Sequence, residues 1–224
     1  MAAVSYDEVM TRVREAAARS GRSAEEVTVV AVSKTMALTD IESVYELGHR
    51  DFGENRAGEM AEKAPNLPND IRWHFVGSLQ SNKVRTVRGL VSLLHSMDRR
   101  SLAKAWMKGQ GLPPPVLVQV NVGNEPQKSG LSPDDVAAEL SWMEGLGLEV
   151  RGLMAIPPIP SQPEDSREHF RSLRLLRDEL QPAHPSLTEL SMGMTDDFEV
   201  AIEEGASIIR VGRAIFGPRN TTGE

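Results

Sequence analysis

The sequence of 224 residues contains no cysteine. This absence excludes disulfide bonds, thiolate metal ligands and a cysteine nucleophile, and it is compatible with a reducing compartment. No uncharged apolar run approaches the roughly 20 residues of a membrane-spanning helix. The first twenty residues carry charged side chains, among them Asp7, Arg12 and Glu15, so they lack the apolar core of a signal peptide. These absences favour a cytoplasmic protein that does not bind a membrane.

The chain has fewer basic than acidic residues, 25 Lys and Arg against 32 Asp and Glu, which gives a net charge of −7. This balance argues against a broad nucleic-acid-binding surface, although a local basic pocket could still bind a phosphate. The 40% hydrophobic and 25% charged residues are typical of globular proteins and exclude a disordered or fibrous chain. Because no linker or low-complexity tract interrupts the sequence, we predict a single domain over residues 1–224.

Short apolar segments alternate with amphipathic segments along the whole chain. The segment 27–33 is apolar on both faces, as a strand buried between two layers should be. Ser132 before Pro133 is a typical helix start, and capping boxes that begin at Ser5 and Thr39 predict two more. The predicted strands are 27–33, 50–55, 71–78, 91–97, 115–122, 148–156, 187–194 and 207–216. The predicted helices between them are 39–47, 56–63, 81–89, 99–108, 132–143, 164–180 and 196–204.

This strict alternation requires parallel strands joined by helical crossovers. Eight such strands in about 220 residues predict a single closed (β/α)8 barrel of the TIM type, with an extra helix at the N-terminus and a core over residues 27–217. An open, doubly wound sheet is the alternative that strand counting leaves open. In a parallel barrel the functional site lies at the carboxyl ends of the strands. Reactive residues that follow a strand are therefore the first candidates.

Lys34 is the first such residue, because it directly follows the strand predicted over 27–33. Both faces of this strand are apolar, so the stem of Lys34 lies in apolar surroundings whichever way it points. Loss of water at the barrel mouth favours the neutral amine, which is the form that attacks a carbonyl group. The alternative is a solubilising lysine whose ammonium group reaches the rim.

The seventh and eighth predicted strands end in segments that could bind a phosphate. Gly193 and Gly212 allow close approach to the backbone, and Ser191 offers a hydroxyl. The loops after these two strands are where barrels most often hold phosphate. The alternative is that both glycines only relieve crowding in a tight barrel. Asp196 and Asp197 would repel a phosphate unless their side chains point away.

Arg210 lies within an apolar strand, where a buried guanidinium group needs acceptors. Glu54, at the end of the second strand, could supply them, and otherwise Arg210 would serve an acceptor on a ligand. Asn55 faces the same mouth. His74 and His95 are interpreted as satisfied core groups more readily than as ligand contacts. No histidine pair has the i, i+4 spacing of a metal site, and the sequence has neither a Gly-x-Ser-x-Gly elbow nor a Walker loop.

Eight short motifs occur in a characteristic order. They are Val30-Ala-Val-Ser-Lys34-Thr, Phe52-Gly-Glu-Asn55, Trp73-His-Phe-Val-Gly-Ser-Leu-Gln-Ser-Asn-Lys83, His95-Ser-Met-Asp98, Lys128-Ser-Gly130, Gly152-Leu-Met-Ala-Ile156, Leu190-Ser-Met-Gly-Met194 and Arg210-Val-Gly-Arg-Ala-Ile-Phe-Gly217. With this set the chain closely resembles the pyridoxal phosphate homeostasis protein family over most of its length. The resemblance implies the barrel of alanine racemase, binding of pyridoxal 5′-phosphate (PLP), no established catalytic activity and a role in vitamin B6 homeostasis.

The resemblance also assigns roles to individual residues. Lys34 matches the lysine that forms a covalent aldimine with PLP, Arg210 the arginine near the pyridine nitrogen, and Asn55 a residue beside the ring. Lys83 and Lys128 lie in matched motifs and are the competing lysines. The implied phosphate clamp, which acts largely through backbone N–H groups, comprises Ser191, Met192, Gly193, Gly212 and Arg213. Thr195 stands where serine is usual and keeps a hydroxyl, while Arg213 stands where threonine is frequent.

A protein of this kind could bind PLP without catalysing a reaction. PLP is a strong electron sink only when an acidic partner polarises its ring nitrogen, and Arg210 keeps its own proton. Racemisation needs a second base, yet neither Tyr6 nor Tyr45 follows a predicted strand, and we expect no second domain before the chain ends at Glu224. We therefore expect a monomer by default that buffers PLP or passes it to PLP-dependent apo-enzymes.

Three alternatives stay open at this stage. The first is a minimal PLP-dependent amino-acid racemase that works with Lys34 alone. The second is a barrel like that of class I aldolases, in which Lys34 attacks a sugar phosphate. The third is an interaction module without a small-molecule site. The colour of the purified protein separates the first from the other two, because only a PLP protein absorbs visible light.

Overall fold

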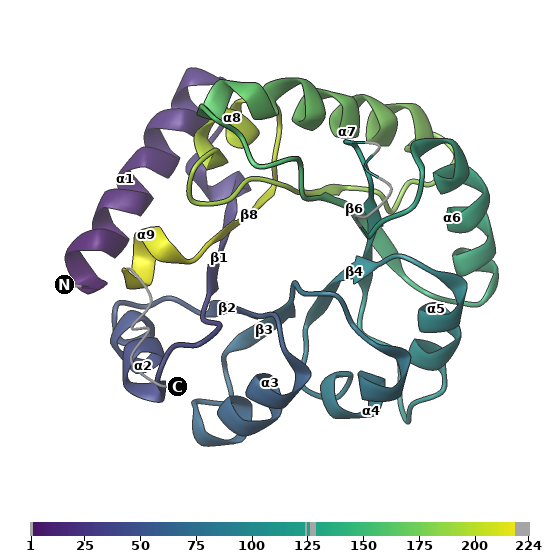
Figure 1. The fold of residues 1–224 in the computed structure, drawn as a ribbon, viewed down its shortest axis with the longest axis horizontal. Coiled ribbons are helices and arrows are strands. Elements are labelled where there is room, and N and C mark those ends of the chain that lie inside the picture. The colour runs from purple at the N-terminus through teal and green to yellow at the C-terminus, as the bar shows by residue number, and fades with distance from the viewer. Residues whose placement is uncertain (1, 124, 126–128, 218–224) are drawn as a thin grey trace.

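The strands close into one parallel barrel, in which each strand pairs with the next along the chain and β8 returns to pair with β1. The computed structural model describes residues 2–123, 125 and 129–217. Figure 1 shows the strands at the centre of a ring of helices. The strands are β1 (Thr28–Val32), β2 (Asp51–Glu54), β3 (Arg72–Phe75), β4 (Leu93–Met97), β5 (Val116–Val120), β6 (Val150–Ala155), β7 (Glu189–Ser191) and β8 (Ile208–Val211).

Helices connect the strands and cover the outside of the barrel. The α-helices of the described residues are α1 (Ala2–Arg19), α2 (Leu38–Glu46), α3 (Ala57–Lys63), α4 (Val84–Val87), α5 (Arg100–Met107), α6 (Val136–Gly145), α7 (Arg167–Leu180), α8 (Phe198–Glu203) and α9 (Arg213–Phe216). Short 3-10 helices are η1 (Ala24–Glu26), η2 (Ala64–Asn66), η3 (Ser81–Lys83), η4 (Pro133–Asp135) and η5 (Pro163–Ser166). Helix α1 packs against α2, α8 and α9, beside the seam where β1 meets β8. The predicted (β/α)8 barrel with an extra N-terminal helix is confirmed, and the open sheet is excluded.

The last predicted strand, 207–216, is wrong in its second half. Strand β8 ends at Val211, and the backbone turns at Gly212 into α9. The N–H groups of Ile215 and Phe216 both donate to the Gly212 carbonyl, which closes this helical turn. The apolar run continues past the strand because Ile215 is buried in the outer core while α9 packs against α1.

Two predicted capping boxes are also wrong. Helix α1 already includes Ser5, so this serine is not the residue that begins the helix. Helix α2 begins one residue before the predicted start. Its N-cap is Ala37, whose N–H donates to the Asp40 carboxylate, so Thr39 does not cap the helix. The predicted start at Ser132 is confirmed, since this residue caps η4, which leads directly into α6.

The barrel separates two apolar cores. A small inner core fills the barrel and is formed by Val30, Val76, Leu93, Leu117, Met154 and Ile208. A much larger outer core lies between the strands and the helices. Because side chains alternate along a strand, Val30, Val32 and Lys34 point to the inner side while Val29 and Ala31 belong to the outer core. Within the described residues we find no helix with the length and apolar character needed to cross a membrane.

Candidate functional site

A cavity of about 250 Å³ opens at the carboxyl ends of the strands. Its lining joins five of the residues predicted from the sequence, which the chain separates by up to 179 positions: Lys34, Asn55, Arg210, Gly212 and Arg213. The remaining lining residues are Val32, Val76, Ile156, Met194, Thr195 and Asp196. An adjoining cavity of about 320 Å³ shares Lys34 and Asn55 and extends along the ends of β2 and β3. The barrel thus gathers these residues at the end where sequence analysis places the site.

Lys34 is half-buried on the wall of this cavity and lies between two anchored residues. On one side, the hydroxyl of Ser33 donates to the Glu54 carboxylate over 2.8 Å. On the other side, the N–H of Thr35 donates to Glu59 Oε2 over 2.7 Å. Thr35 adopts a φ of +65°, which is uncommon for a residue other than glycine. The bond to Glu59 helps hold this conformation, and it fixes where the Lys34 side chain leaves the backbone.

A second, buried lysine supports the same loop. Lys63 Nζ donates to the Ser33 carbonyl over 2.8 Å, to Glu54 Oε1 over 2.7 Å and to Glu59 Oε2 over 3.1 Å. Burial raises the pKa of Glu54, although Lys63 and Ser33 act in the opposite direction. Glu54 therefore pairs with Lys63, outside the barrel, so its expected pairing with Arg210 is wrong. The reason is strand alternation, which turns Glu54 to the same outer side as Phe52.

Arg210 forms part of the cavity floor and is only 4% exposed. Its Nη1 donates to the Ser191 hydroxyl over 2.6 Å and its Nη2 to the Ala155 carbonyl over 2.8 Å. Burial lowers the pKa of Arg210 to about 10, so the group stays protonated at neutral pH. Both hydrogen-bond acceptors are neutral oxygens, and the positive charge therefore favours an electron-rich partner in the cavity.

The three predicted residues of the seventh strand end lie behind the cavity wall. Ser191 is fully buried under the floor, where its hydroxyl contacts Arg210 and His95. Met192 belongs to the outer core. Gly193 adopts a φ of +90°, and a Cβ atom there would lie 2.5 Å from the Ala201 Cβ. The structure thus brings Met194 and Thr195 to the cavity in their place.

The two aspartates after β7 point in different directions. Asp197 is buried, where Oδ1 accepts the Met194 N–H over 2.7 Å and Oδ2 accepts the Ser166 hydroxyl over 2.7 Å. Asp196 is exposed and forms an ion pair of 2.5 Å with Arg213 at the rim. An anion in the cavity would thus meet one carboxylate already paired with a cation, and a second that is turned into the protein.

The Oδ1 atom of Asn55 is buried and has no hydrogen-bond partner among the described residues. The end of β2 lies very close to the end of β3 at this point, since a Cβ atom on Gly77 would lie 2.3 Å from the Asn55 carbonyl. Of the competing lysines, Lys83 is exposed and absent from the described lining, while Lys128 lies outside the described residues.

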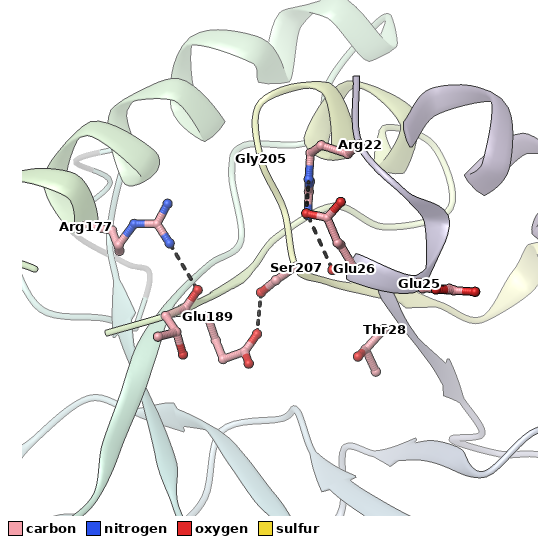
Figure 2. Close-up of a pocket in the computed structure, with 9 residues that line it drawn as sticks. Arg22, Glu25, Glu26, Thr28, Arg177, Glu189, Gly205 and Ser207 are labelled. Carbon is pink, nitrogen blue, oxygen red and sulfur yellow. Dashed lines mark hydrogen bonds and ion pairs between the residues drawn. The ribbon is translucent and has the colours of Figure 1, made fainter. Parts of the chain in front are cut away.

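A separate depression of about 500 Å³ opens at the opposite end of the barrel (Figure 2). Its walls carry polar side chains from the amino ends of β1, β7 and β8. These side chains largely satisfy one another: Ser207 donates to Glu189, Arg177 donates to the Thr188 carbonyl, and Arg22 pairs with Glu26. In a parallel barrel this end serves stability, so we place the functional site at the other end.

Sequence reasoning missed the residues that support the site from outside the barrel. The sequence places Lys63 and Glu59 only on a predicted helix, where a turn of charged residues usually indicates a solvated face. The i, i+4 spacing of this pair and the low exposure of Lys63 place both beneath the Lys34 loop. His74 and His95 are buried core groups, as interpreted, and are absent from the described cavity lining. No cluster of metal-ligating side chains is found in the described part of the chain.

Comparisons with known proteins agree with this geometry. The family model of the alanine racemase N-terminal domain matches residues 4–220. The pyridoxal phosphate homeostasis protein of Aquifex aeolicus is 43% identical over 217 residues, which cover 94% of this chain and 95% of the relative. PipY of Synechococcus elongatus, whose structure was solved with PLP bound, is 37% identical, with a TM-score of 0.77 over 86% of this chain and 93% of PipY. A crystal structure from Bifidobacterium adolescentis, described as an unknown protein, reaches a TM-score of 0.90 at 32% identity over 96% of this chain and 94% of that one. The chain therefore belongs to the family of pyridoxal phosphate homeostasis proteins, which carry the alanine racemase N-terminal domain.

Proposed function

We propose that this protein binds PLP through a covalent bond to Lys34 and keeps the cofactor available in the cell without catalysing a reaction on it. The single observation that carries this proposal is the meeting of Lys34 and the buried cation of Arg210 in one cavity at the carboxyl ends of the strands. Membership of the family and the PLP-bound structure of PipY support it.

The residues present fit PLP on three counts. Lys34 offers the amine for the aldehyde carbon, and the unpartnered Oδ1 of Asn55 offers a buried acceptor beside it. Arg210 offers its guanidinium group to the ring nitrogen from the floor. The backbone near Met194 and Gly212 offers a place for the phosphate. The nearby carboxylates do not oppose it, because Asp197 is bonded to the Met194 N–H and Asp196 is paired with Arg213. The phosphate clamp that we propose is therefore the backbone of Gly193, Thr195, Gly212 and Arg213, since Asp197 already accepts the Met194 N–H, with Ser191 and Met192 as its buried support.

When bound, PLP supplies an electrophilic carbon and a ring that can accept electrons from a substrate. The protein's own groups limit the second property. Arg210 donates hydrogen bonds and keeps its proton at neutral pH, so it holds the ring nitrogen as an acceptor and does not protonate it. Without a protonated nitrogen the ring withdraws electrons weakly, which favours storage over chemistry.

The cavity also provides few groups that could move a proton on a bound amino acid. Among the described lining residues, Lys34 and Asp196 are the only ones that could act as bases, and Asp196 is paired with Arg213 at the rim. Tyr6 donates to, or accepts from, His49, and Tyr45 donates to Asp70, both away from the cavity. This arrangement favours a carrier over the alternative of a minimal racemase. We further propose a monomer in the cytoplasm that passes PLP to PLP-dependent apo-enzymes.

The test begins with the visible spectrum of the purified protein after incubation with PLP. We expect a visible absorption band that Lys34→Ala abolishes and that Lys83→Ala, the matched change at an exposed lysine, leaves intact. Reduction with borohydride should make the bond permanent, and peptide mapping should place the label on Lys34. A colourless wild type, or a label on another lysine, would overturn the proposed site.

A second measurement addresses catalysis. L-Alanine incubated with the PLP-loaded protein in deuterated water should keep its α-hydrogen. If that hydrogen exchanges, and Lys34→Ala abolishes the exchange, the proposed carrier function is wrong and the racemase is supported. Recovery of activity by a PLP-dependent apo-enzyme mixed with the loaded protein would support transfer.

A further inference from the structure

A continuous chain of hydrogen bonds crosses the interior of the barrel below the cavity. We call its four members the core relay: Asp51, His74, His95 and Ser191. His74 Nε2 lies 3.2 Å from Asp51 Oδ1, and His74 Nδ1 lies 2.9 Å from His95 Nε2. His95 Nδ1 lies 2.8 Å from the Ser191 hydroxyl, which accepts the hydrogen bond from Arg210. The relay thus connects the amino end of β2 with the floor of the site.

The core relay is not required by packing alone. The six side chains of the inner core are apolar, and a barrel of this size is usually filled by such residues. His95 is fully buried, His74 is 6% exposed and Ser191 is fully buried. Buried polar groups destabilise a fold unless all their hydrogen bonds are made, so a complete chain of four is a costly way to fill the space.

The chemistry of the two ends fixes the direction of every bond in the relay. Asp51 is a carboxylate that accepts from Arg72 as well: burial opposes its ionisation, but the bonds from His74 and Arg72 hold its pKa well below the usual range. His74 therefore donates from Nε2, and in its neutral tautomer Nδ1 accepts the Nε2–H of His95.

The same reasoning continues to the cavity floor. With its proton on Nε2, His95 accepts through Nδ1, so the Ser191 hydroxyl donates to it. The lone pairs of Ser191 then face Arg210, whose Nη1–H they accept. In this arrangement every donor in the relay has one acceptor.

We propose that the core relay is a positioning device for Arg210, which orients the guanidinium group against the cofactor ring from the opposite end of the barrel. This proposal rests on the proposed function only where it names the ring of PLP as the partner of Arg210. Asp51, His74 and His95 act through Ser191 and touch neither cofactor nor substrate.

Charged groups face the relay from several elements. Arg210 on β8 and Arg72 on β3 are cations at its two ends, Asp51 is the anion on β2, and His49 lies just before that strand. Asp197 is the acidic group that acts on Arg210 from beside α8. Burial, followed by the charge of Arg210, lowers the pKa of His95.

The first experiment uses the protein without PLP. Nuclear magnetic resonance of the imidazole nitrogens should find both His74 and His95 neutral, with the proton on Nε2. A resolved, slowly rotating guanidinium signal is expected for Arg210. It should average to a single signal in His95→Leu but persist in His184→Leu, a matched change at a buried histidine that bonds Glu144 away from the relay. A proton on Nδ1 of His95, or an Arg210 signal that His95→Leu leaves unchanged, would overturn the relay.

The second experiment uses the same variants loaded with PLP. Loss of the relay should weaken PLP binding about five- to tenfold, the effect of one misplaced hydrogen bond, and should move the midpoint of the pH titration of the visible band. His95→Asn, whose amide reaches the position of Nδ1, should restore the wild-type midpoint. Ser191→Ala, which removes one oxygen, replaces His95→Leu if that variant folds poorly.

The two proposals fail in different ways. A wild type without a visible band overturns the proposed function, and the Arg210 signal then decides the relay by itself. A wild type with the band on Lys34, but with the same midpoint and affinity in His95→Leu and His184→Leu, overturns the relay and leaves the proposed function intact.

Discussion

Replacing Lys63 by methionine tests how the barrel supports Lys34. The substitution conserves the length of the side chain and removes its charge, which leaves the Glu54 carboxylate buried without its cation. Glu54 is 0% exposed, and its Oε2 atom already lacks a protein partner among the described residues. Breaking one side of a buried ion pair costs about 3–5 kcal/mol, because the remaining charge is uncompensated. We expect Lys63→Met to lower the melting temperature by about 10 °C in a domain of this size.

The effect of Lys63→Met on stability should depend on pH, and the pKa of Glu54 gives the direction of that dependence. The pKa of Glu54 is already raised in the folded protein, and loss of Lys63 raises it further. A raised carboxyl pKa contributes stability that is complete below the unfolded value and disappears as the pH rises through the folded value. The stability difference between Lys63→Met and the wild type should therefore be smallest near the ordinary pKa of a glutamate carboxyl and grow as the pH rises above it, by up to about 1.4 kcal/mol per pH unit.

Urea unfolding followed by circular dichroism at several pH values measures this difference. The control is the double variant Glu54→Gln with Lys63→Met, which has no buried charge and can keep the hydrogen bond to Ser33. It should recover most of the lost stability and lose the pH dependence. If Lys63→Met stays within about 1 kcal/mol of the wild type near pH 8, or if Glu54→Gln fails to rescue it, the buried pair does not support the Lys34 loop in the way described.

Three further predictions concern the frame of the site. Gly193→Ala should destabilise the fold by about 2–3 kcal/mol, since its φ is +90° and the new Cβ would meet Ala201, whereas Gly58→Ala, with open space, should be neutral or stabilising in the same thermal melts. Asp51→Asn should flatten the loss of stability in acid, because a lowered carboxyl pKa contributes stability that is present above the unfolded value and lost as the pH falls; equal acid unfolding of both proteins would contradict this. Arg88→Met should cost about 2–4 kcal/mol in urea unfolding, because the buried guanidinium donates to three backbone carbonyls, one in the last turn of α5 and two just after it.

The fold was largely predictable because its signals are local. Each strand is a short apolar run, each is followed by an amphipathic segment, and eight repeats of that pattern leave few architectures. Sites of parallel barrels lie at the carboxyl ends of the strands, and this rule alone predicts that Lys34, Asn55 and Gly212 meet at one end of the barrel. The signal failed at the end of β8, where an apolar residue such as Ile215 serves a helix as well as a strand.

The support of the site was less predictable, because it depends on which long-range neighbours meet. Nothing in the sequence near Glu54 indicates that its partner is nine residues away on α3 and not on β8. Strand parity gives the correct side only once the bounds of β2 are known, since Glu54 follows the inward Gly53 and therefore points outward. The same parity turns Gly53 inward, where a Cβ atom would lie 2.7 Å from Val30.

The core relay shows why a lone histidine is hard to interpret from sequence. His74 and His95 stand on neighbouring strands, 21 residues apart, and each taken alone resembles a core group with one local hydrogen bond. Their role becomes apparent only from the contact with Ser191, which lies 96 residues after His95 and across the barrel. A closed barrel makes such contacts unavoidable, because residues that point inward from opposite strands share one narrow interior. Polar residues at inward positions of several strands are therefore the pattern to search for, and in this chain they lead from the amino-end surface to Arg210 on the floor of the cavity.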